Sequence, residues 1–425
     1  MNIEIINTGS ELMLGFVLNT HQQWLCRKLS DAGYDVTRQV AIADTGRAIQ
    51  QAVREALGRA DFAIVTGGLG PTSDDITRDL IAELLGKKLQ LDADILTKLE
   101  NFFAERKRPM PANTKVQAQV PEGAIVLPNA HGTAPGLAME ISPNPFRADG
   151  KASWLVMLPG PPRELRPMFT DQALPLLREK LPLSDIFVCR TLRTTGMGES
   201  FVEEKIADAL KPLMVDGLGL GYCAHHGAVD VRLVARGTNA NTMVSDGEAI
   251  IREKLDAHVF GTGDEELSDV VVRLLTERKE TLVLAESCTG GYVANRITDV
   301  PGASAVFLCG LVTYSNEAKR QLLGVKAETL AKHGAVSQET AREMAEGARM
   351  RYMADYAISI TGIAGPSGGT TEKPVGTVFM ALAMNHHSFS MKAINRYDRP
   401  TFKDITCRQA LELLRRALLA AAVKK

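Results

Sequence analysis

Short apolar runs alternate with amphipathic segments through the first part of the chain. Strand-like runs cover residues 3–6, 36–42, 62–65 and 155–158, and helix-period segments cover residues 20–32 and 47–59. This alternation is typical of a wound α/β sheet with parallel strands, because each helix returns the chain to the same edge of the sheet. We therefore expect an α/β fold for the N-terminal region.

A shorter pattern follows in the middle of the chain. It predicts strands at 187–195, 218–222 and 229–235 and helices at 198–210 and 241–257, which together form an α+β module. The polar segment GTGDEE at 261–266 indicates a domain boundary, and a helix pattern at 267–277 begins the last domain. The sequence thus predicts three domains, at residues 1–170, 171–260 and 261–425.

Length and charge limit the classes of function. A chain of 425 residues is long enough for two or three domains with separate cores. The 49 basic and 50 acidic residues nearly balance, so nucleic acid is not an expected partner. The N-terminus lacks a secretory signal pattern and no apolar run is as long as a membrane span, so we expect a cytoplasmic protein without a membrane partner. Six scattered cysteines without Cys-x-x-Cys spacing indicate reduced thiols and no structural zinc.

The segment 281–337 has the pattern of a reaction centre. An apolar run is expected to deliver Ser287 to the end of a strand. Thr289, Gly290 and Gly291 then open a helix, whose first N–H groups have no partner within the helix. This is a suitable place for a nucleophile and for binding the substrate.

A second apolar run, at 305–313, ends in Tyr314. Ser315 or Asn316 can cap the helix that carries Lys319. Strand ends are therefore predicted to present a Ser, a Tyr and a Lys together.

These residue types suit acyl transfer. A serine hydroxyl such as that of Ser287 is a weak nucleophile unless a base removes its proton, and Lys319 can serve if burial lowers its pKa. Tyr314 can relay the proton or orient the serine, and the N–H groups after Ser287 can stabilise an oxyanion. Cys288 is a rival nucleophile, although a small buried thiol is the commoner role for such a residue.

Further loops carry glycine. The loop TGIAGPSGG at 361–369, which begins with Thr361 and Gly362, suits contact with a phosphate or an amide. Arg399 can bind a phosphate bidentately or lie on the surface. The Gly-x-Ser-x-Gly match inside this loop is not followed by a helix pattern, so an α/β-hydrolase triad is disfavoured. No Walker-type phosphate loop or dinucleotide fingerprint occurs, which disfavours ATP hydrolysis and NAD-dependent redox chemistry.

The segment TGGLGPTSDD at 66–75 follows a buried strand pattern and precedes a helix pattern. Its glycines allow the backbone to approach a phosphate closely, and the following helix N-terminus favours negative charge. We expect phosphate binding at Gly67, Gly68, Gly70 and Thr72.

Acidic residues lie at the same predicted edge of the sheet. Asp74 and Asp75 can hold a divalent cation against a phosphate, or can only cap the helix. Glu11, after the first strand, is a third candidate ligand or an ordinary acid in the first turn of a helix. The segments HGTAPG at 131–136 and LPGPPREL at 158–165 predict further loops at this edge, or only structural turns.

The motifs taken together resemble one family. AESCTGG, VPGAS, VTYSNEAK, GAVS, TGIAGPSGG and PVGTV, in this order after residue 284, resemble the C-terminal domain of CinA-type competence/damage-inducible proteins. TGGLGPTSDDIT, NTKVQAQVPEGA, GTAPG and LPGPPREL resemble the N-terminal domain of that family, which is similar to molybdopterin-binding proteins. The resemblance covers essentially the whole chain.

For the C-terminal domain the resemblance implies a nicotinamide-nucleotide amidohydrolase that needs no cofactor. Nicotinamide mononucleotide would be the substrate, and nicotinic acid mononucleotide and ammonia the products. Ser287 matches the nucleophile of the family and Lys319 its base, with Tyr314 and Thr361 as catalytic partners. Arg399 matches less well, because the usual Gly-Asp-Arg pattern is Tyr-Asp-Arg here.

For the N-terminal domain the resemblance implies a metal-dependent ADP-ribose pyrophosphatase. Glu11, Asp74 and Asp75 would hold Mg or Co, although Gly-Ser-Glu replaces the usual Gly-Thr-Glu or Gly-Asp-Glu around Glu11. The middle module resembles a small KH-like domain, and the family suggests a homodimer.

Two rival functions remain open from the sequence. A non-catalytic nucleotide sensor would bind ligand at both loops without releasing product. A DNA-uptake accessory, suggested by the name of the family, agrees poorly with the balanced charge.

Overall fold

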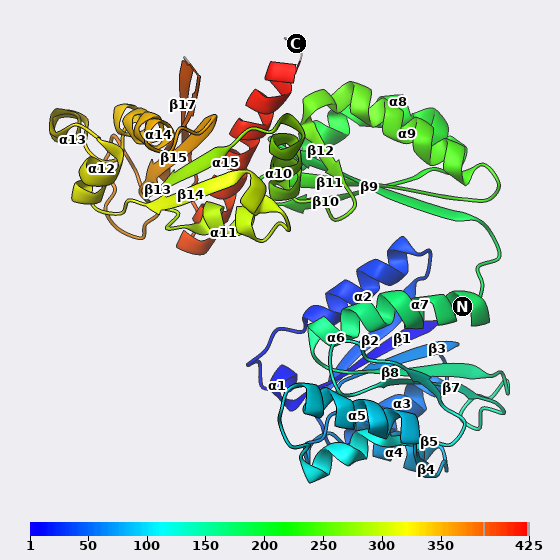
Figure 1. Ribbon diagram of the computed structural model, residues 1–425. Coiled ribbons are helices and arrows are strands. Elements are labelled where there is room, and N and C mark those ends of the chain that lie inside the picture. Colours follow the sequence, from blue (N-terminus) through cyan, green and yellow to red (C-terminus); the bar gives the residue numbers. More distant parts are fainter. Residues whose placement is uncertain (386, 423–425) are drawn as a thin grey trace. The chain divides into compact units, whose positions relative to one another are not determined.

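The computed structural model describes residues 1–385 and 387–422. The chain divides into two compact units, Met1–Val188 and Cys189–Lys425. Figure 1 colours the chain along its sequence and labels the elements of each unit. No helix in the described ranges has both the length and the apolar character needed to cross a bilayer.

The first unit is built on a six-stranded mixed sheet with the order β2-β1-β3-β8-β7-β6. The strands in this order are Val36–Ile42, Ile3–Thr8, Phe62–Thr66, Ser153–Leu158, Gly136–Ile141 and Ile125–Leu127. The first four pair in parallel, as the alternating pattern predicts, whereas β7 and β6 are antiparallel. A short loop joins β6 to β7, and a parallel pair would need a crossover of a dozen or more residues.

Helices cover both faces of this sheet. On one face lie α2 (Thr20–Asp31), α6 (Pro162–Met168), η2 (Phe169–Ala173) and α7 (Leu174–Lys180). On the other lie α3 (Gly46–Leu57), α4 (Thr77–Leu84), α5 (Ala93–Glu105) and η1 (Ala112–Ala118). Strands β1, β3 and β8 are buried along their whole length, which explains their continuous apolar runs. The remaining elements are α1 (Ser10–Met13) and the ribbon of β4 (Leu89–Leu91) and β5 (Gln119–Pro121).

The strand order of this sheet reverses direction between β1 and β3. The chain goes from β1 outward to β2 and then returns across β1 to β3. Ligands of open α/β sheets bind beside such a reversal, at the carboxyl ends of the strands. The loops that begin at Gly9 and Gly67 flank this place.

The second unit begins with a four-stranded sheet of order β10-β11-β9-β12. Its strands are Gly219–His225, Ala228–Arg236, Phe187–Thr195 and Val259–Thr262, and its helices are α8 (Glu199–Val215), α9 (Ala240–Leu255) and η3 (Asp256–His258). The predicted α+β module is therefore confirmed.

The rest of the second unit is a five-stranded sheet of order β14-β13-β15-β16-β17. The strands are Phe307–Val312, Leu282–Glu286, Tyr356–Gly362, Thr377–Met384 and His387–Ile394. The helices α10 (Leu267–Arg278), α11 (Tyr292–Thr298) and α15 (Arg399–Ala422) pack on one face. On the other face pack α12 (Asn316–Leu323) and α14 (Gln338–Tyr352), with α13 (Ala327–His333) beside α14 and η4 (Ala303–Ala305) preceding β14. The α/β fold class is confirmed for both ends of the chain.

Candidate active site

Ser287 is the first residue after β13, an interior strand of the C-terminal sheet. Its N–H donates to the carbonyl oxygen of Ile360 in neighbouring β15 at 2.9 Å, which fixes the backbone at this point. The side chain is only 8% exposed. The apolar run of β13 therefore delivers a hydroxyl to a sheltered strand end, as the sequence predicts.

Lys319 meets this serine from helix α12. Its Nζ lies 3.1 Å from the Oγ of Ser287, 2.8 Å from the carbonyl oxygen of Thr313 and 3.3 Å from that of Tyr314. A neutral amine has two N–H donors and one lone pair. As an ammonium, Lys319 donates to all three oxygens. As a neutral amine it donates to the two carbonyl oxygens and can accept from the serine hydroxyl, so the contacts suit either form.

Burial favours the unprotonated form of this lysine. The side chain is 1% exposed, and loss of solvation lowers the pKa of the Lys319 amine below its ordinary value. Ser315 caps α12 by accepting from the N–H of Ala318 at 3.0 Å, and this cap fixes the start of the helix that carries Lys319. The structure therefore brings a hydroxyl and a basic amine into contact.

Cys288 is a poor nucleophile in this setting. Its side chain lies in the apolar core of the domain, and loss of solvation raises the pKa of the Cys288 thiol to about 12. The thiolate is the reactive form of cysteine, and little of it exists near neutral pH at such a pKa. The geometry agrees with a small buried thiol.

Tyr314 is placed differently from the serine and the lysine. Its side chain is 62% exposed, and its hydroxyl accepts a hydrogen bond of 2.9 Å from Nη2 of Arg399. The same arginine donates through Nη1 to the carbonyl oxygen of Gly365 at 3.0 Å. Lys319 contacts only the backbone of Tyr314. The phenol and guanidinium thus form a polar pair in which Arg399 links the loop 361–369 to the strand end at Tyr314.

Thr361 and Gly362 end the strand next to Ser287. The hydroxyl of Thr361 donates to the carbonyl oxygen of Ala335 at 2.7 Å, and the residue is 1% exposed. A Cβ on Gly362 would lie 2.7 Å from the carbonyl oxygen of Thr377, so this position requires glycine. Both residues shape the backbone beside the serine.

The sequence predicts that backbone N–H groups after Ser287 stabilise an oxyanion. Some of these N–H groups already donate to acceptors within the turn. The N–H of Gly290 donates to the carbonyl oxygen of Ser287 at 3.1 Å, and the N–H of Gly291 donates to Oε2 of Glu286 at 2.9 Å. The N–H groups of Cys288 and Thr289 donate to no other residue in the described ranges. These two N–H groups thus have no protein acceptor, and both residues are buried beside Ser287.

Glu286 organises this turn, and the sequence analysis did not single it out. Its carboxylate is buried and also accepts from the N–H groups of Val293 and Ala294, at 3.2 and 2.8 Å. It satisfies the start of α11, where the helix dipole favours negative charge. Glu286 is an acidic residue at the end of an otherwise apolar strand, and this pattern is the signal in the sequence that could have identified it.

The hydroxyl of Thr289 is a further unused polar group at this turn. Its Oγ1 is buried, and no residue within the described ranges hydrogen-bonds to it. Buried hydroxyls are normally paired, so an unpaired one beside the nucleophile suits contact with a bound ligand.

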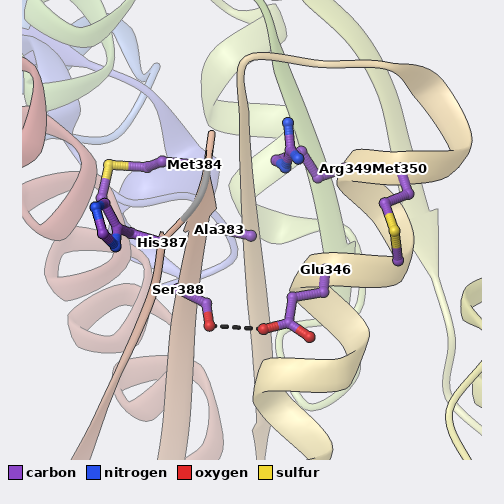
Figure 2. Close-up of a pocket in the computed structure, with 7 residues that line it drawn as sticks. All are labelled: Glu346, Arg349, Met350, Ala383, Met384, His387 and Ser388. Carbon is purple, nitrogen blue, oxygen red and sulfur yellow. Dashed lines mark hydrogen bonds between the residues drawn. The ribbon is translucent and has the colours of Figure 1, made fainter.

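A separate cavity in the same domain lies away from this cluster. Figure 2 shows it between α14 and the β16–β17 hairpin, where Ser388 donates to Glu346 at 2.6 Å. It encloses about 230 Å³. Its lining residues Ala383 and Met384 end β16, and Ala383 pairs with the amino end of β15. The cavity therefore opens at the opposite edge of the sheet from Ser287.

In the N-terminal domain, the loop after β3 has the backbone expected of a phosphate loop. Gly67 and Gly68 have φ values of 97° and 67°, a region that favours glycine. A Cβ on Gly68 would lie 2.0 Å from the Oγ1 of Thr77, so the loop packs closely against the start of α4. Gly70 is similarly close to Asp75.

The three candidate metal ligands do not form a cluster. Glu11 and Asp74 are exposed, while Oδ2 of Asp75 accepts from the N–H of Thr72 at 3.0 Å and from its hydroxyl. Within the part of the chain that the structure describes, no three His, Cys, Asp or Glu side chains come together as a metal site. The donor chemistry suits a divalent cation, but this arrangement does not, because Asp75 caps its own loop.

Family models match the chain in three consecutive segments. The model described as "CinA C-terminal domain" matches residues 264–418, "Damage-inducible protein CinA KH domain" matches 189–261, and "Probable molybdopterin binding domain" matches 4–179. These three domains agree with the fold class expected from the sequence.

Full-length relatives are similar throughout. A CinA-like protein of Kosmotoga olearia is 44% identical over 422 residues, which is 99% of each chain. A CinA-like protein of Akkermansia muciniphila is 42% identical over 97% of this chain and 96% of its own length. The solved structure of competence/damage inducible protein CihA from Agrobacterium tumefaciens is 44% identical, covers 36% of this chain and 93% of that chain, and has a TM-score of 0.35.

Proposed function

This chain belongs to the CinA family, and on that premise we propose that its C-terminal domain hydrolyses the carboxamide of nicotinamide mononucleotide. The products are nicotinic acid mononucleotide and ammonia. The observation that carries the proposal is the contact of 3.1 Å between the buried Lys319 amine and the Ser287 hydroxyl. A buried amine of lowered pKa beside a sheltered hydroxyl is the arrangement that an amide-cleaving serine needs.

The first half of the reaction forms an acyl-enzyme. The Oγ of Ser287 attacks the carboxamide carbon while neutral Lys319 takes the hydroxyl proton. The N–H groups of Cys288 and Thr289 stabilise the negative charge on the carboxamide oxygen. The Lys319 ammonium then gives its proton to the departing nitrogen, the C–N bond breaks, and ammonia leaves.

The second half restores the serine. Water attacks the ester carbon while Lys319 takes one of its protons. Lys319 returns that proton to the Oγ of Ser287 as the ester bond breaks, and the carboxylic acid is released. Arg399, beside the exposed Tyr314, is the cation that binds the 5′-phosphate of the nucleotide.

An ammonia-release assay on the full-length protein tests this proposal. The amidase predicts equal amounts of ammonia and nicotinic acid mononucleotide from nicotinamide mononucleotide. A nucleotide sensor predicts saturable binding with no product. Saturable binding without ammonia from a folded preparation would therefore replace the amidase with the sensor.

For the N-terminal domain the proposed reaction is hydrolysis of the pyrophosphate of ADP-ribose to AMP and ribose 5-phosphate. It is supported by the glycine loop 67–72 beside the reversal of strand order, where the backbone can approach phosphates. Mg or Co is the expected divalent ion. Since Glu11, Asp74 and Asp75 do not converge, no step is assigned to the metal. Release of AMP from ADP-ribose by the full chain is the test.

A further inference from the structure

The turn between β10 and β11 belongs to the middle module, and its tip contacts the C-terminal domain. His226 and Gly227 form this tight turn, and Gly227 has a φ of 74°, a value that favours glycine. The centroid of the His226 ring lies 5.6 Å from that of the Tyr397 ring, and the ring planes are tilted by 57°. Both modules belong to one compact unit. The function proposed above does not use this contact.

Hydrogen bonds hold the turn against the end of β9. The carbonyl oxygen of Gly227 accepts from the N–H of Gly196 at 3.4 Å and from the hydroxyl of Thr195 at 3.3 Å. The hydroxyl of Thr194 donates to the carbonyl oxygen of Val229 at 2.7 Å. These bonds fix the backbone of the turn relative to the rest of the middle module.

A network of charged side chains continues from this hairpin to the C-terminal domain. Nε2 of His225 lies 3.0 Å from Oδ2 of Asp230, and the Asp230 carboxylate pairs with Arg193 of β9 at 2.8 Å. Arg193 also donates to the carbonyl oxygen of Glu265 at 3.0 Å and pairs with Glu266, the N-cap of α10, at 3.4 Å. Asp230 and Arg193 are buried. Buried polar networks rigidify the elements that they join, so the hairpin is held at the start of the C-terminal domain.

A second set of contacts joins the middle module to helix α15. Arg415 is buried and donates to the carbonyl oxygen of Ala257 in η3. Nη2 of Arg416 lies 3.2 Å from Nδ1 of His258, also in η3. The module therefore contacts α15 near the carboxyl end of the helix, and it contacts Tyr397 just before the amino end.

The segment that carries Tyr397 leads directly into the candidate active site. Asp398 caps α15, because its carboxylate accepts from the N–H of Thr401 at 3.1 Å and from the hydroxyl of that residue at 2.7 Å. The N–H of Tyr397 donates to the carbonyl oxygen of Asn395 at 3.0 Å. Only the capping residue separates Tyr397 from Arg399. A contact that fixes the tyrosine therefore also restricts the backbone from which the arginine extends.

The side chain of Arg399 needs such support. It is exposed, and Tyr397 beside it is 51% exposed. The guanidinium reaches the Tyr314 hydroxyl at 2.9 Å and the carbonyl oxygen of Gly365 at 3.0 Å, both at the rim of the site. A long exposed side chain loses much rotamer freedom when it is fixed on a ligand. Contacts that fix it beforehand reduce this cost and strengthen binding.

We infer that the middle module orients the phosphate-binding arginine of the amidase, through His226 and Tyr397, and so strengthens the preference for a mononucleotide over its nucleoside. The inference rests on the proposed amide hydrolysis and deepens it by assigning the module a role in selecting the substrate. His226 and Tyr397 are positioning residues, because they act through Arg399 and not on the carboxamide. Tyr397 replaces the glycine of the usual Gly-Asp-Arg pattern, and a glycine has no ring to make this contact.

Ammonia release from nicotinamide mononucleotide and from nicotinamide riboside by the full-length protein tests the inference. The two substrates share the carboxamide and the ribose and differ in the phosphate. His226→Ala and Tyr397→Ala should each raise the KM for the mononucleotide about two- to tenfold at unchanged kcat, the loss expected for one aromatic contact. The KM for the riboside should not change. Tyr397→Phe, which keeps the ring, should restore the wild-type KM for the mononucleotide.

The Arg399→Ala background distinguishes positioning of the arginine from direct contact with the phosphate. Arg399→Ala should itself remove most of the preference for the mononucleotide. Addition of His226→Ala should then raise the KM no further, because residues that act through one group are not additive.

His387→Ala is the matched control. His387 is another exposed histidine of this unit, but it lines the cavity of Figure 2 at the opposite edge of the sheet. This variant should have the wild-type KM for both substrates. An unchanged mononucleotide KM in both His226→Ala and Tyr397→Ala, an equal rise for the two substrates, or a further rise in the Arg399→Ala background would each overturn the inference.

Calorimetric titration of the Ser287→Ala protein with nicotinamide mononucleotide separates the inference from the proposed reaction. Weaker binding when His226→Ala or Tyr397→Ala is added, together with no ammonia from the wild-type protein, would remove the reaction and keep the positioning role. Ammonia release with one mononucleotide KM in the wild type and both variants would keep the reaction and remove the inference. No binding of the mononucleotide to the folded protein would remove both.

Discussion

The two candidate sites of this chain differ in how far they are assembled before a ligand arrives. In the C-terminal domain, Ser287 and Lys319 are buried and already in contact at 3.1 Å. In the N-terminal domain, Glu11 and Asp74 are exposed, and the carboxylate of Asp75 is bound to its own loop. The C-terminal site is assembled before its substrate binds. In the N-terminal site the three carboxylates lie apart and would have to come together when a ligand binds.

This difference follows from the charges involved. A hydroxyl and a neutral amine can be buried together at little cost, because both are uncharged and hydrogen-bonded. Three carboxylates cannot be brought together without a cation, since like charges repel strongly at short range. The difference in assembly between the two sites therefore agrees with the chemistry proposed for each of them.

Ser287→Ala should have the largest effect on the preassembled site. Removing the nucleophile should reduce ammonia release from nicotinamide mononucleotide by about 10³-fold or more. Cys288→Ala is the neighbouring control and should keep most of the activity, because its thiol is buried and protonated. Activity that survives in Ser287→Ala and disappears in Cys288→Ala would assign the nucleophile to the thiol.

Lys319→Ala should lower kcat by about 10²–10³-fold, because general base catalysis contributes about 10²–10⁴. The wild-type pH profile sharpens the assignment. Burial lowers the pKa of Lys319 from 10.5, so the neutral, active form grows as pH rises. We expect kcat/KM to increase with pH to a plateau, with a midpoint below 10.5. An activity that falls over this range would argue for a protonated lysine as the acting species.

Removal of metal should change the activity of the N-terminal site and leave that of the C-terminal site unchanged. If a divalent ion draws Glu11, Asp74 and Asp75 together when substrate binds, dialysis against a chelator should reduce ADP-ribose turnover about 10²-fold, and added Mg or Co should restore it. Ammonia release by the same preparation should not change, because the proposed amide hydrolysis uses Ser287, Lys319 and backbone N–H groups and no metal. Full pyrophosphatase activity in the chelated protein would contradict the metal requirement.

Glu286→Gln should weaken the preassembled site by about tenfold in kcat with little change in KM. A glutamine keeps the shape of the side chain but cannot accept three backbone N–H bonds, and an unpaired buried donor costs about 1–3 kcal/mol. The turn that presents the N–H groups of Cys288 and Thr289 then loosens. Glu317→Gln, at an exposed acid on α12, is the control and should have the wild-type kcat.

Tyr314→Phe should have the smallest effect, a few-fold increase in KM. Loss of the hydroxyl removes the acceptor for Arg399, so the guanidinium is less well oriented toward a phosphate, while the Ser287–Lys319 contact is untouched. Steady-state kinetics will show the change in KM. A fall in kcat beyond about 10²-fold would instead indicate that the phenol takes part in proton transfer.

Periodicity predicted the parts of this fold that depend on burial. Apolar runs located the strands that flank Ser287. Ser315 and Asn316 were the two candidates for the cap of the helix that carries Lys319, and Ser315 is the cap. The antiparallel β6–β7 pair was missed because strand direction depends on connection length, which the apolar pattern does not encode.

Side-chain direction was harder to predict than position. Tyr314 and Lys319 were both expected near Ser287, but only Lys319 points inward, since it lies on the buried face of α12. Glu286 lies within the AESCTGG motif but was missed, because its role is to accept from the backbone of the next helix, and the sequence does not show such a contact directly. Asp75 follows β3 as the pattern predicted, yet hydrogen bonds to Thr72 within its own loop set the direction of its carboxylate.

The enclosure of Lys319 has a consequence for chemical labelling. The side chain of Lys319 is only 1% exposed. Bulky acylating reagents that modify the surface lysines should therefore leave its amine unmodified. A small electrophile directed at serine would instead react at Ser287 only when that amine is unprotonated. The extent of serine labelling would then report the protonation state of a buried amine that bulky reagents do not modify.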